Sequence, residues 1–467
     1  MKSRIHFFSR NHALLIATIA LFIIAAVYTR AFRSDLPTPV SKIQVSSIDS
    51  CELSLANHKG ESPLDIDIVR YQKLSQGTNN PNAYLERLGW AYIGKARSSF
   101  DPGYFKLAQQ TGLCLQRRDP NDLQAQLLLG HVLHQLHLFK QSESIARVLV
   151  ERRGQWLDFA LLGDVLMEQG NLLEAEQAYQ AMIDQRPGPQ AYLRAAHMRW
   201  LKGDLAGSLE LMQLAVGAIG EKNSESAAWA WVRLAGYVRQ TKRFRLAESY
   251  IERALALQPD YPPALLLSGE ILMSRGQYKQ ATKVLSQAVE LNPLPLYLWS
   301  YLEALSQVGD EKLVARIEQR LMRQAANLDR RSFALYLASR KQNVPLALEL
   351  ARQELEVRQD VFTLDSMAWA LRANGKMTQA WKFANRALAE GTNDARLFYH
   401  AGVIAEETGL PEFAVDYYHR ALDLNHLLLP SEREDMELRF AAVSLRKGDL
   451  ARGLTRPNHD LTTTGEI

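Results

Sequence analysis

The chain is 467 residues long, with 47% hydrophobic and 23% charged residues, and it carries a net charge of +4. This length exceeds what one hydrophobic core supports, which leaves either several globular domains or a repeat array. The excess positive charge is confined to residues 1–33, where five basic residues stand without an acidic one, so the remainder has 50 basic and 51 acidic side chains. A near-neutral body argues against nucleic-acid binding as a global property, because that binding depends on neutralising phosphates.

The N-terminal region contains an uncharged apolar run from Ala13 to Tyr28 that is flanked by basic residues. As a helix this run would be about 24 Å long, against a hydrocarbon core of roughly 30 Å, so flanking residues must contribute to a span. We therefore predict a short cytoplasmic N-terminus over 1–12 and a transmembrane helix over 13–30. A cleaved secretory signal is the main alternative, but the bulky, charged sequence Val27–Arg30 offers no small-x-small cleavage site.

Two features bear on which side of the membrane carries the body. Three basic residues precede the apolar run and two follow it, which is a weak signal for a cytoplasmic N-terminus. It predicts a single-pass protein of the bacterial inner (cytoplasmic) membrane with a periplasmic body, and a cytoplasm-facing body is the alternative. Cys51 and Cys114 are the only cysteines, a pair that an oxidising compartment could join; two separate thiols are the other reading.

Beyond the apolar run the sequence divides into a linker and a long helical region. Residues 31–81 are rich in Pro and Ser in places and predict a linker with one helix near Ile66–Leu74. Helical periodicity then continues almost unbroken to about Arg446. A glycine followed five residues later by a small or β-branched residue recurs, with adjacent intervals of 33, 33 and 34, at Gly170/Ala175, Gly203/Ser208, Gly276/Ala281, Gly309/Val314, Gly375/Ala380 and Gly409/Ala414. This period is that of a helix pair.

These positions resemble the tetratricopeptide repeat. Its first helix carries a large residue with Leu-Gly three and four positions later, and its second helix carries Ala, an aromatic residue and Ala, often followed by Pro. Five segments match well: Phe159-Leu162-Gly163-Leu166-Ala175-Tyr179-Met182-Pro187, Trp231-Leu234-Ala235-Val238-Ala247-Ile251-Ala254-Pro259, Leu265-Ser268-Gly269-Leu272-Ala281-Leu285-Ala288-Pro293, Leu364-Met367-Ala368-Leu371-Ala380-Ala384-Ala387 and Phe398-Ala401-Gly402-Ala405-Ala414-Tyr418-Ala421. Weaker copies lie between and before them.

The resemblance implies an all-α fold, a right-handed α-solenoid of about ten helical hairpins over 82–428. No hairpin of such an array buries its own apolar face, so stability rests on stacking. The small residues let the two helices of a repeat approach closely, and the large ones fill the space between repeats. We also predict a capping helix over 429–453 and a disordered tail over 454–467.

In this family the first helices line a concave groove. Transferred residue by residue, the exposed groove positions are Trp90, His131, His134, Asp164, His197, Trp200, Trp229, Arg239, Glu270, Trp299, Glu303, Tyr336, Asp365, Trp369, Arg372 and Tyr399. An aromatic lining with charges of both signs suits an extended peptide or a partner helix. Filling of a narrow interior by the same side chains is the alternative for any one of them.

No sequence motif of a catalytic or cofactor site is present. The chain has no phosphate-binding glycine loop, no Gly-x-Ser-x-Gly, no His-Glu-x-x-His and no Cys-x-x-Cys. The histidines of the run 131–137 could chelate a metal, but no third ligand is evident, so we predict neither metal nor cofactor, and no small-molecule ligand.

We therefore expect a non-enzymatic scaffold that binds partner proteins in a cell-envelope complex of the secretion, exopolysaccharide or cytochrome-maturation type. It would be held to the membrane by its N-terminal helix. The alternatives are a cytoplasm-facing adaptor that regulates a membrane enzyme, and an accessory subunit that binds a glycan or a metal.

Overall fold

The computed structural model describes residues 49–77, 79–220, 224–324 and 328–454. Helices make up most of this part of the chain, and no strand occurs in it. No helix in these ranges is long and apolar enough to cross a bilayer. The predicted cytoplasmic segment 1–12, the transmembrane helix 13–30 and the tail beyond residue 454 lie outside the described residues.

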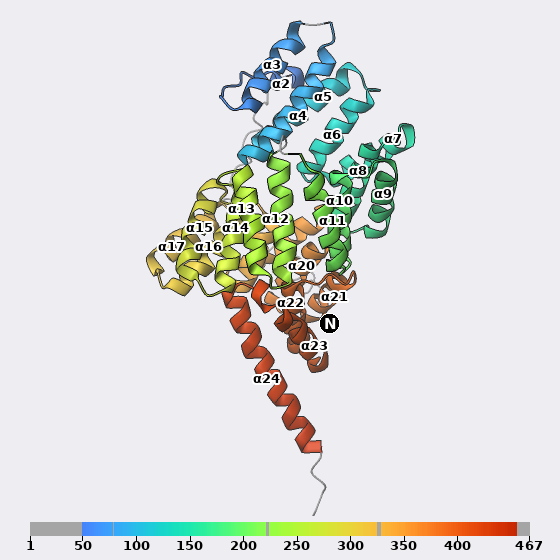
Figure 1. The fold of residues 1–467 in the computed structure, drawn as a ribbon. Helices are drawn as coiled ribbons and strands as arrows, with labels where there is room; N and C mark the ends of the chain where they lie inside the picture. Colours follow the sequence, from blue (N-terminus) through green and yellow to red (C-terminus); the bar gives the residue numbers. More distant parts are fainter. Residues whose placement is uncertain (1–48, 78, 221–223, 325–327, 455–467) are drawn as a thin grey trace, which may run out of the picture.

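Ten helical hairpins follow one another from Pro81 to Asp423, in agreement with the predicted repeat array (Figure 1). The first helices of the hairpins are α4 (Pro81–Ser99), α6 (Leu123–Gln135), α8 (Trp156–Glu168), α10 (Pro189–Leu201), α12 (Ser224–Gln240), α14 (Pro262–Ser274), α16 (Pro295–Val308), α18 (Arg330–Arg340), α20 (Val361–Ala373) and α22 (Ala395–Glu407). The second helices are α5 (Gly103–Arg118), α7 (Phe139–Arg152), α9 (Leu172–Gln185), α11 (Leu205–Ala218), α13 (Phe244–Leu257), α15 (Tyr278–Leu291), α17 (Glu311–Gln324), α19 (Val344–Val357), α21 (Met377–Leu388) and α23 (Pro411–Asp423).

The local sequence fixes where these helices begin and how closely they pair. Asp122, Asp204 and Asp394 accept hydrogen bonds from free N–H groups in the first turns of α6, α11 and α22. Within a hairpin, a Cβ on Gly163 would lie 2.4 Å from the ring of Tyr179, and one on Gly402 would lie 2.7 Å from Tyr418. Only glycine allows these helices to approach so closely, which is the role that the repeat pattern predicts.

The region predicted as a linker is folded from residue 49 onward. Helices α2 (Ser50–Ser54) and α3 (Pro63–Gly77) pack against α5 and α4, and a disulfide between Cys51 and Cys114 joins α2 to α5 with a Cα–Cα distance of 4.8 Å. Several buried side chains of α3 are polar. Asp65 pairs with Lys95 at 2.8 Å, and Gln72 donates to the hydroxyl of Tyr92 at 3.0 Å. The helix predicted near Ile66–Leu74 lies within α3, but residues 49–77 pack against α4 and α5 where a linker is predicted, because these polar residues resemble solvent-exposed positions in sequence.

The chain ends in α24 (Pro430–Leu454), where a capping helix is predicted. A short 3₁₀ helix, η2 (Asn425–Leu427), leads into it. The first part of α24 packs against α22 and α23 and buries Met436 and Val443. The rest of the helix projects from the body (Figure 1).

The solenoid closes on itself, which the sequence does not reveal. The ends of α8, α10 and α12 meet the loops that precede α20, α22 and α24. The N–H of Gln359 donates to the carbonyl of Glu168 at 3.0 Å. Thr392 donates to the carbonyl of Leu201, 191 residues away, and the Nε2–H of His426 donates to the carbonyl of Arg239 at 3.1 Å, 187 residues away. We call this set of contacts the seam.

Side chains reinforce the seam. Arg358 pairs with Glu168 at 3.3 Å, and the rings of Trp200 and Phe362 stack with centroids 5.8 Å apart. Val361 is buried within the apolar core formed by α6 to α14. The array therefore contacts itself, because the winding of the repeats brings the first helices of one turn onto the loops of the next.

The turn glycines allow a direct test of the seam. Gly203 and Gly276 both have positive φ, +82° and +72°, but an added Cβ would lie 2.6 Å from the carbonyl oxygen of Gly391 at Gly203 and would meet nothing within 4 Å at Gly276. Both alanine variants incur the left-handed penalty of about 1–2 kcal/mol. Gly203→Ala should lose roughly 1–3 kcal/mol more than Gly276→Ala, because it also separates the two turns. Urea unfolding of both variants measures the difference, and equal losses would show that the turns do not touch.

Candidate partner-binding groove

All sixteen residues predicted to line the groove lie on first helices, but the structure divides them into two groups: eight are at least partly exposed and eight are buried. Trp229 is 41% exposed. The residues that are partly exposed are Trp90, His131, His134, Asp164, His197, Arg239 and Glu270. The residues that are buried are Trp200, Trp299, Glu303, Tyr336, Asp365, Trp369, Arg372 and Tyr399. The prediction of an exposed surface is wrong for this second group, all but one of which lie on α16 to α22.

The first turn of α24 occupies part of the interior of the C-terminal half of the array, which comprises α16 to α23. Glu303 of α16 is 1% exposed and accepts hydrogen bonds from the N–H and the hydroxyl of Ser431, at 3.1 and 2.8 Å. The same carboxylate accepts from the indole of Trp299 at 3.2 Å and pairs with Arg340 at 3.2 Å. A partner cannot reach Glu303 while this segment is in place.

Neighbouring side chains fill the rest of this half. Trp369 stacks on His400 with ring centroids 3.8 Å apart, and His400 bonds Asp365 at 2.9 Å. Arg372 lies over the Trp369 ring at 4.3 Å and pairs with Glu407. The hydroxyl of Tyr399 donates to Asp435 at 2.8 Å. In the C-terminal half the aromatic residues are therefore packing residues.

The N-terminal half differs, because the inward-facing side chains of α4, α6, α8, α10 and α12 are only partly covered. We call this surface the N-terminal inner face. At its centre Arg194 forms two hydrogen bonds to Asp164, at 2.8 and 2.7 Å, and Tyr179 donates to the same carboxylate at 2.9 Å. Burial alone would raise the pKa of Asp164, but the charge and hydrogen bonds of Arg194 lower it below its usual value.

Two arginines on this face are held by histidines. Arg97 lies 3.1 Å from Nε2 of His131, and Arg233 lies 2.9 Å from Nδ1 of His197. Burial, followed by the charge of the adjacent arginine, lowers the pKa of each of these histidines to about 3. Both imidazoles are therefore neutral at physiological pH and accept the guanidinium N–H bond.

Sequence reasoning missed Arg97, Arg194 and Arg233. The spacing along the helices could have identified two of them. Arg97 follows Trp90 by seven residues and Arg233 follows Trp229 by four, so each arginine lies on the same helix face as a predicted groove residue. The transferred family positions did not include these arginines.

The structure offers no metal site within the described ranges, where no group of three His, Cys, Asp or Glu side chains is placed to hold an ion. The rings of His131 and His134 are 6.5 Å apart, and the Arg97 guanidinium at His131 would repel a cation.

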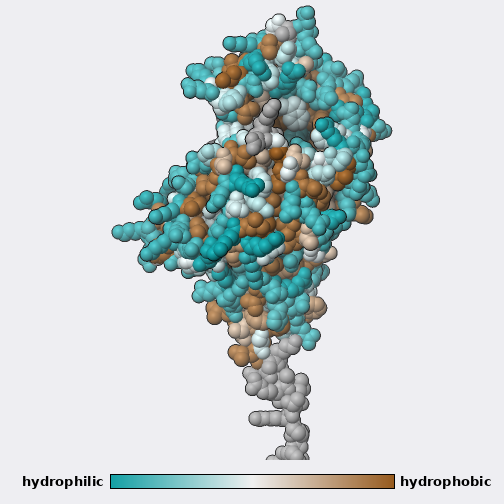
Figure 2. All heavy atoms as spheres, viewed as in Figure 1, coloured by the Kyte–Doolittle hydropathy of each residue, from teal (hydrophilic) through white to brown (hydrophobic). Residues whose placement is uncertain are grey.

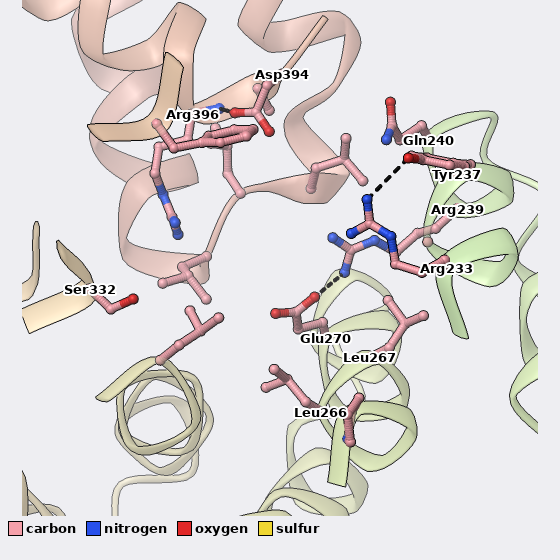
Figure 3. A pocket seen from close by; sticks show the side chains of 18 of the residues that line it. Arg233, Tyr237, Arg239, Gln240, Leu266, Leu267, Glu270, Ser332, Asp394 and Arg396 are labelled. Carbon is pink, nitrogen blue, oxygen red and sulfur yellow. Dashed lines mark hydrogen bonds and ion pairs between the residues drawn. The ribbon is translucent and has the colours of Figure 1, made fainter. Parts of the chain in front are cut away.

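A cavity of about 540 Å³ lies between the two turns, next to the N-terminal inner face (Figure 3). Arg233, Arg239 and Glu270 lie on one wall, from α12 and α14, and Arg396 of α22 lies on the opposite wall. Trp200, Trp229, Tyr297 and Phe362 also line it, as does the segment around η2. The face of the molecule seen in Figure 2 is mostly hydrophilic at its periphery, and hydrophobic residues are more frequent toward its centre.

The neutral histidines make stability depend on pH. An unfolded histidine titrates near pH 6.5, so the unfolded chain takes up protons below this pH while His131 and His197 stay neutral down to about pH 3. The stability that they contribute is fully present above about pH 6.5 and is lost as the pH falls toward 3.

The double variant His131→Gln/His197→Gln should lose less stability between pH 7 and pH 5 than the wild type, measured by urea midpoints. His419→Gln, at an exposed position, is the control; a pH profile unchanged from the wild type in the double variant would contradict this account.

Comparisons with known proteins agree with the repeat architecture. Two family models described as tetratricopeptide repeat match residues 161–228 and 239–304. No curated protein matches the sequence at a significant level. Similar solved structures include the APC/C hetero-tetramer Cut9-Hcn1, at 15% identity and a TM-score of 0.43, covering 86% of this chain and 63% of that chain. Yeast Tom70 is also similar, at 12% identity and a TM-score of 0.34, covering 84% of this chain and 96% of that chain. A human IFIT1 dimer with PPP-AAAA is similar at 13% identity and a TM-score of 0.43, covering 80% of this chain and 94% of that chain.

Proposed function

Because this chain is a tetratricopeptide repeat protein, a class of fold that typically serves as a non-catalytic protein-binding scaffold, we propose that it holds a partner protein on its N-terminal inner face. The observation that carries this proposal is the division of the interior. In the C-terminal half the chain's own side chains and the η2 segment take up the inward-facing positions. In the N-terminal half Trp90, His131 and Trp229 remain partly or largely accessible.

The chemistry of this face suits a protein segment. Trp90 and Trp229 can supply apolar contact area, and Arg97 and Arg233 present guanidinium groups with neutral acceptors. Aromatic residues and arginines are enriched among the residues that dominate binding energy at interfaces. An extended segment or a helix that lies across α4 to α12 would contact both kinds of side chain.

We further propose that the scaffold works in a bacterial cell envelope, anchored by the apolar segment 13–30 and with its body in the periplasm. The arrangement of basic residues around that segment supports this topology. The Cys51–Cys114 disulfide also supports it, because such bonds persist in oxidising compartments. The complex that it serves would be of the secretion, exopolysaccharide or cytochrome-maturation type.

Site-directed photocross-linking tests where the partner binds. A photoreactive residue at Trp229 or His131 should give the same discrete adduct, whereas one at Leu173, which is 70% exposed on the second helix α9, should give none. Mass spectrometry of the adduct identifies the partner. Equal recovery from Leu173 would contradict binding on the inner face. Trp299 and Trp369 are unsuitable positions because both are buried.

The state of the cysteines in cells tests the topology. If the body is periplasmic, Cys51 and Cys114 should resist alkylation when the full-length protein is acid-trapped and denatured, and they should react after reduction. Denaturation is needed because Cys114 is fully buried. An alkaline phosphatase fused after Leu454 should likewise be active. Two freely alkylated thiols with an inactive fusion would place the body in the cytoplasm.

A further inference from the structure

The cavity between the two turns has the properties of a ligand site. Its volume of about 540 Å³ falls within the range of roughly 300–1,000 Å³ that is usual for small-molecule pockets. Its walls combine apolar and aromatic side chains with seven charged ones. It exists only because the chain returns on itself at the seam, and it adjoins the N-terminal inner face, with which it shares Trp229 and Arg233.

The carboxylates that line the cavity all have partners. Glu270 pairs with Arg239 at 2.6 Å, and Asp365 bonds His400 at 2.9 Å. Asp394 accepts from the N–H groups of Arg396 and Leu397, at 2.9 and 3.1 Å, and so caps α22. None of these carboxylates pairs with Arg233.

Four arginines line the cavity, and three of them are paired with carboxylates. Arg239 pairs with Glu270, Arg331 with Asp360 at 3.1 Å and Arg396 with Glu432 at 2.8 Å. Arg233 has no carboxylate partner among the residues that the structure describes. An arginine left without a counter-ion in a partly enclosed site is costly, unless an anion is bound there.

The surroundings of Arg233 stabilise the guanidinium without neutralising it. Its Nη2 bonds the neutral His197 at 2.9 Å. It also donates to the hydroxyl of Tyr237 at 3.1 Å (Figure 3). The group lies over the rings of Trp229 and Tyr237, at 5.8 and 5.3 Å from their centroids. Cation–π contacts and neutral acceptors hold an arginine in place while leaving its charge available for an anion.

A glycine beside Arg233 leaves room for that anion. Gly236 lies within α12 and lines the cavity, and an added Cβ would meet nothing within 4 Å. Three other glycines inside first helices have a packing reason, since a Cβ on Gly130, Gly163 or Gly269 would lie 2.4–2.6 Å from a neighbouring side chain. Glycine inside a helix costs about 1 kcal/mol relative to alanine. At Gly236 no contact within the chain requires glycine, and its effect is to widen the cavity.

We propose that this cavity binds a small organic anion, with one carboxylate or similar anionic group at Arg233 and an apolar or aromatic body against Trp200, Tyr297 and Phe362. The open space at Gly236 admits the ligand next to the guanidinium. The proposal goes beyond the protein-binding function and does not depend on it. It also revises the expectation, drawn from the sequence, that the chain has no small-molecule ligand.

Isothermal titration of the full-length chain with 4-phenylbutanoate and with 4-phenylbutan-1-ol tests the proposal, after subtraction of the heat of the detergent alone. The two probes share one apolar body and differ in charge. The acid should bind at least about tenfold more tightly than the alcohol, and Arg233→Gln should remove this difference. Equal binding of the two probes, or no binding of the acid, would overturn the proposal.

The glycine provides the steric test with a matched control. Gly236→Phe should abolish binding of the acid by filling the cavity, whereas Gly217→Phe, on α11 and likewise with nothing within 4 Å of the added Cβ, should bind as the wild type does. Gly236→Ala should raise the melting temperature, which would show that α12 tolerates a side chain there. Wild-type affinity in Gly236→Phe would overturn the proposal. Photocross-linking of the wild-type chain at His131, which does not line the cavity, reports on the protein partner separately, so failure of one proposal can be told from failure of the other.

Discussion

The seam between the two turns of the solenoid is the contact on which the arrangement of the interior depends. In a helical-repeat array each hairpin contacts only its neighbours, and stability is a sum of local terms. Here, backbone groups of Glu168, Leu201 and Arg239 accept hydrogen bonds from residues almost two hundred positions later. These bonds make hairpins that are distant in sequence structurally interdependent, and they convert a concave ribbon into a body with an enclosed interior.

Enclosure changes what the first helices can do. In the C-terminal half the inward-facing side chains meet one another and the η2 segment, so Trp299 and Trp369 are packing residues with satisfied indole N–H groups. In the N-terminal half the seam loops reach only the ends of α8, α10 and α12, where Phe362 stacks on Trp200, and Trp229 stays exposed. The same family position therefore serves packing in one half and accessibility in the other, and the difference comes from the seam.

Charge follows the same division. Arg396 of α22 pairs with the buried Glu432 of α24, and Arg340 of α18 pairs with the buried Glu303 of α16, which also accepts from Ser431 of α24. Each of these buried carboxylates is thus compensated by an arginine. On the N-terminal inner face and at the cavity, Arg97 and Arg233 are instead held by neutral histidines. A protein that compensates most of its inward-facing charges but leaves these two available retains positive potential where a ligand or partner can use it.

The sequence by itself determined the repeat architecture, because the glycines and alanines at fixed spacing are required for close helix pairing within each hairpin, as Gly163 against Tyr179 shows. That requirement is local, and local requirements leave a periodic record. The sequence did not determine the packing of α2 and α3 against the first repeat, since α3 buries polar residues such as Asp65 and Gln72 through specific partners. Nor did it determine the seam, the exposure of each inner residue or the cavity at Arg233. These depend on the accumulated rotation from repeat to repeat, which brings together residues of unrelated sequence position, and only the tertiary structure records it.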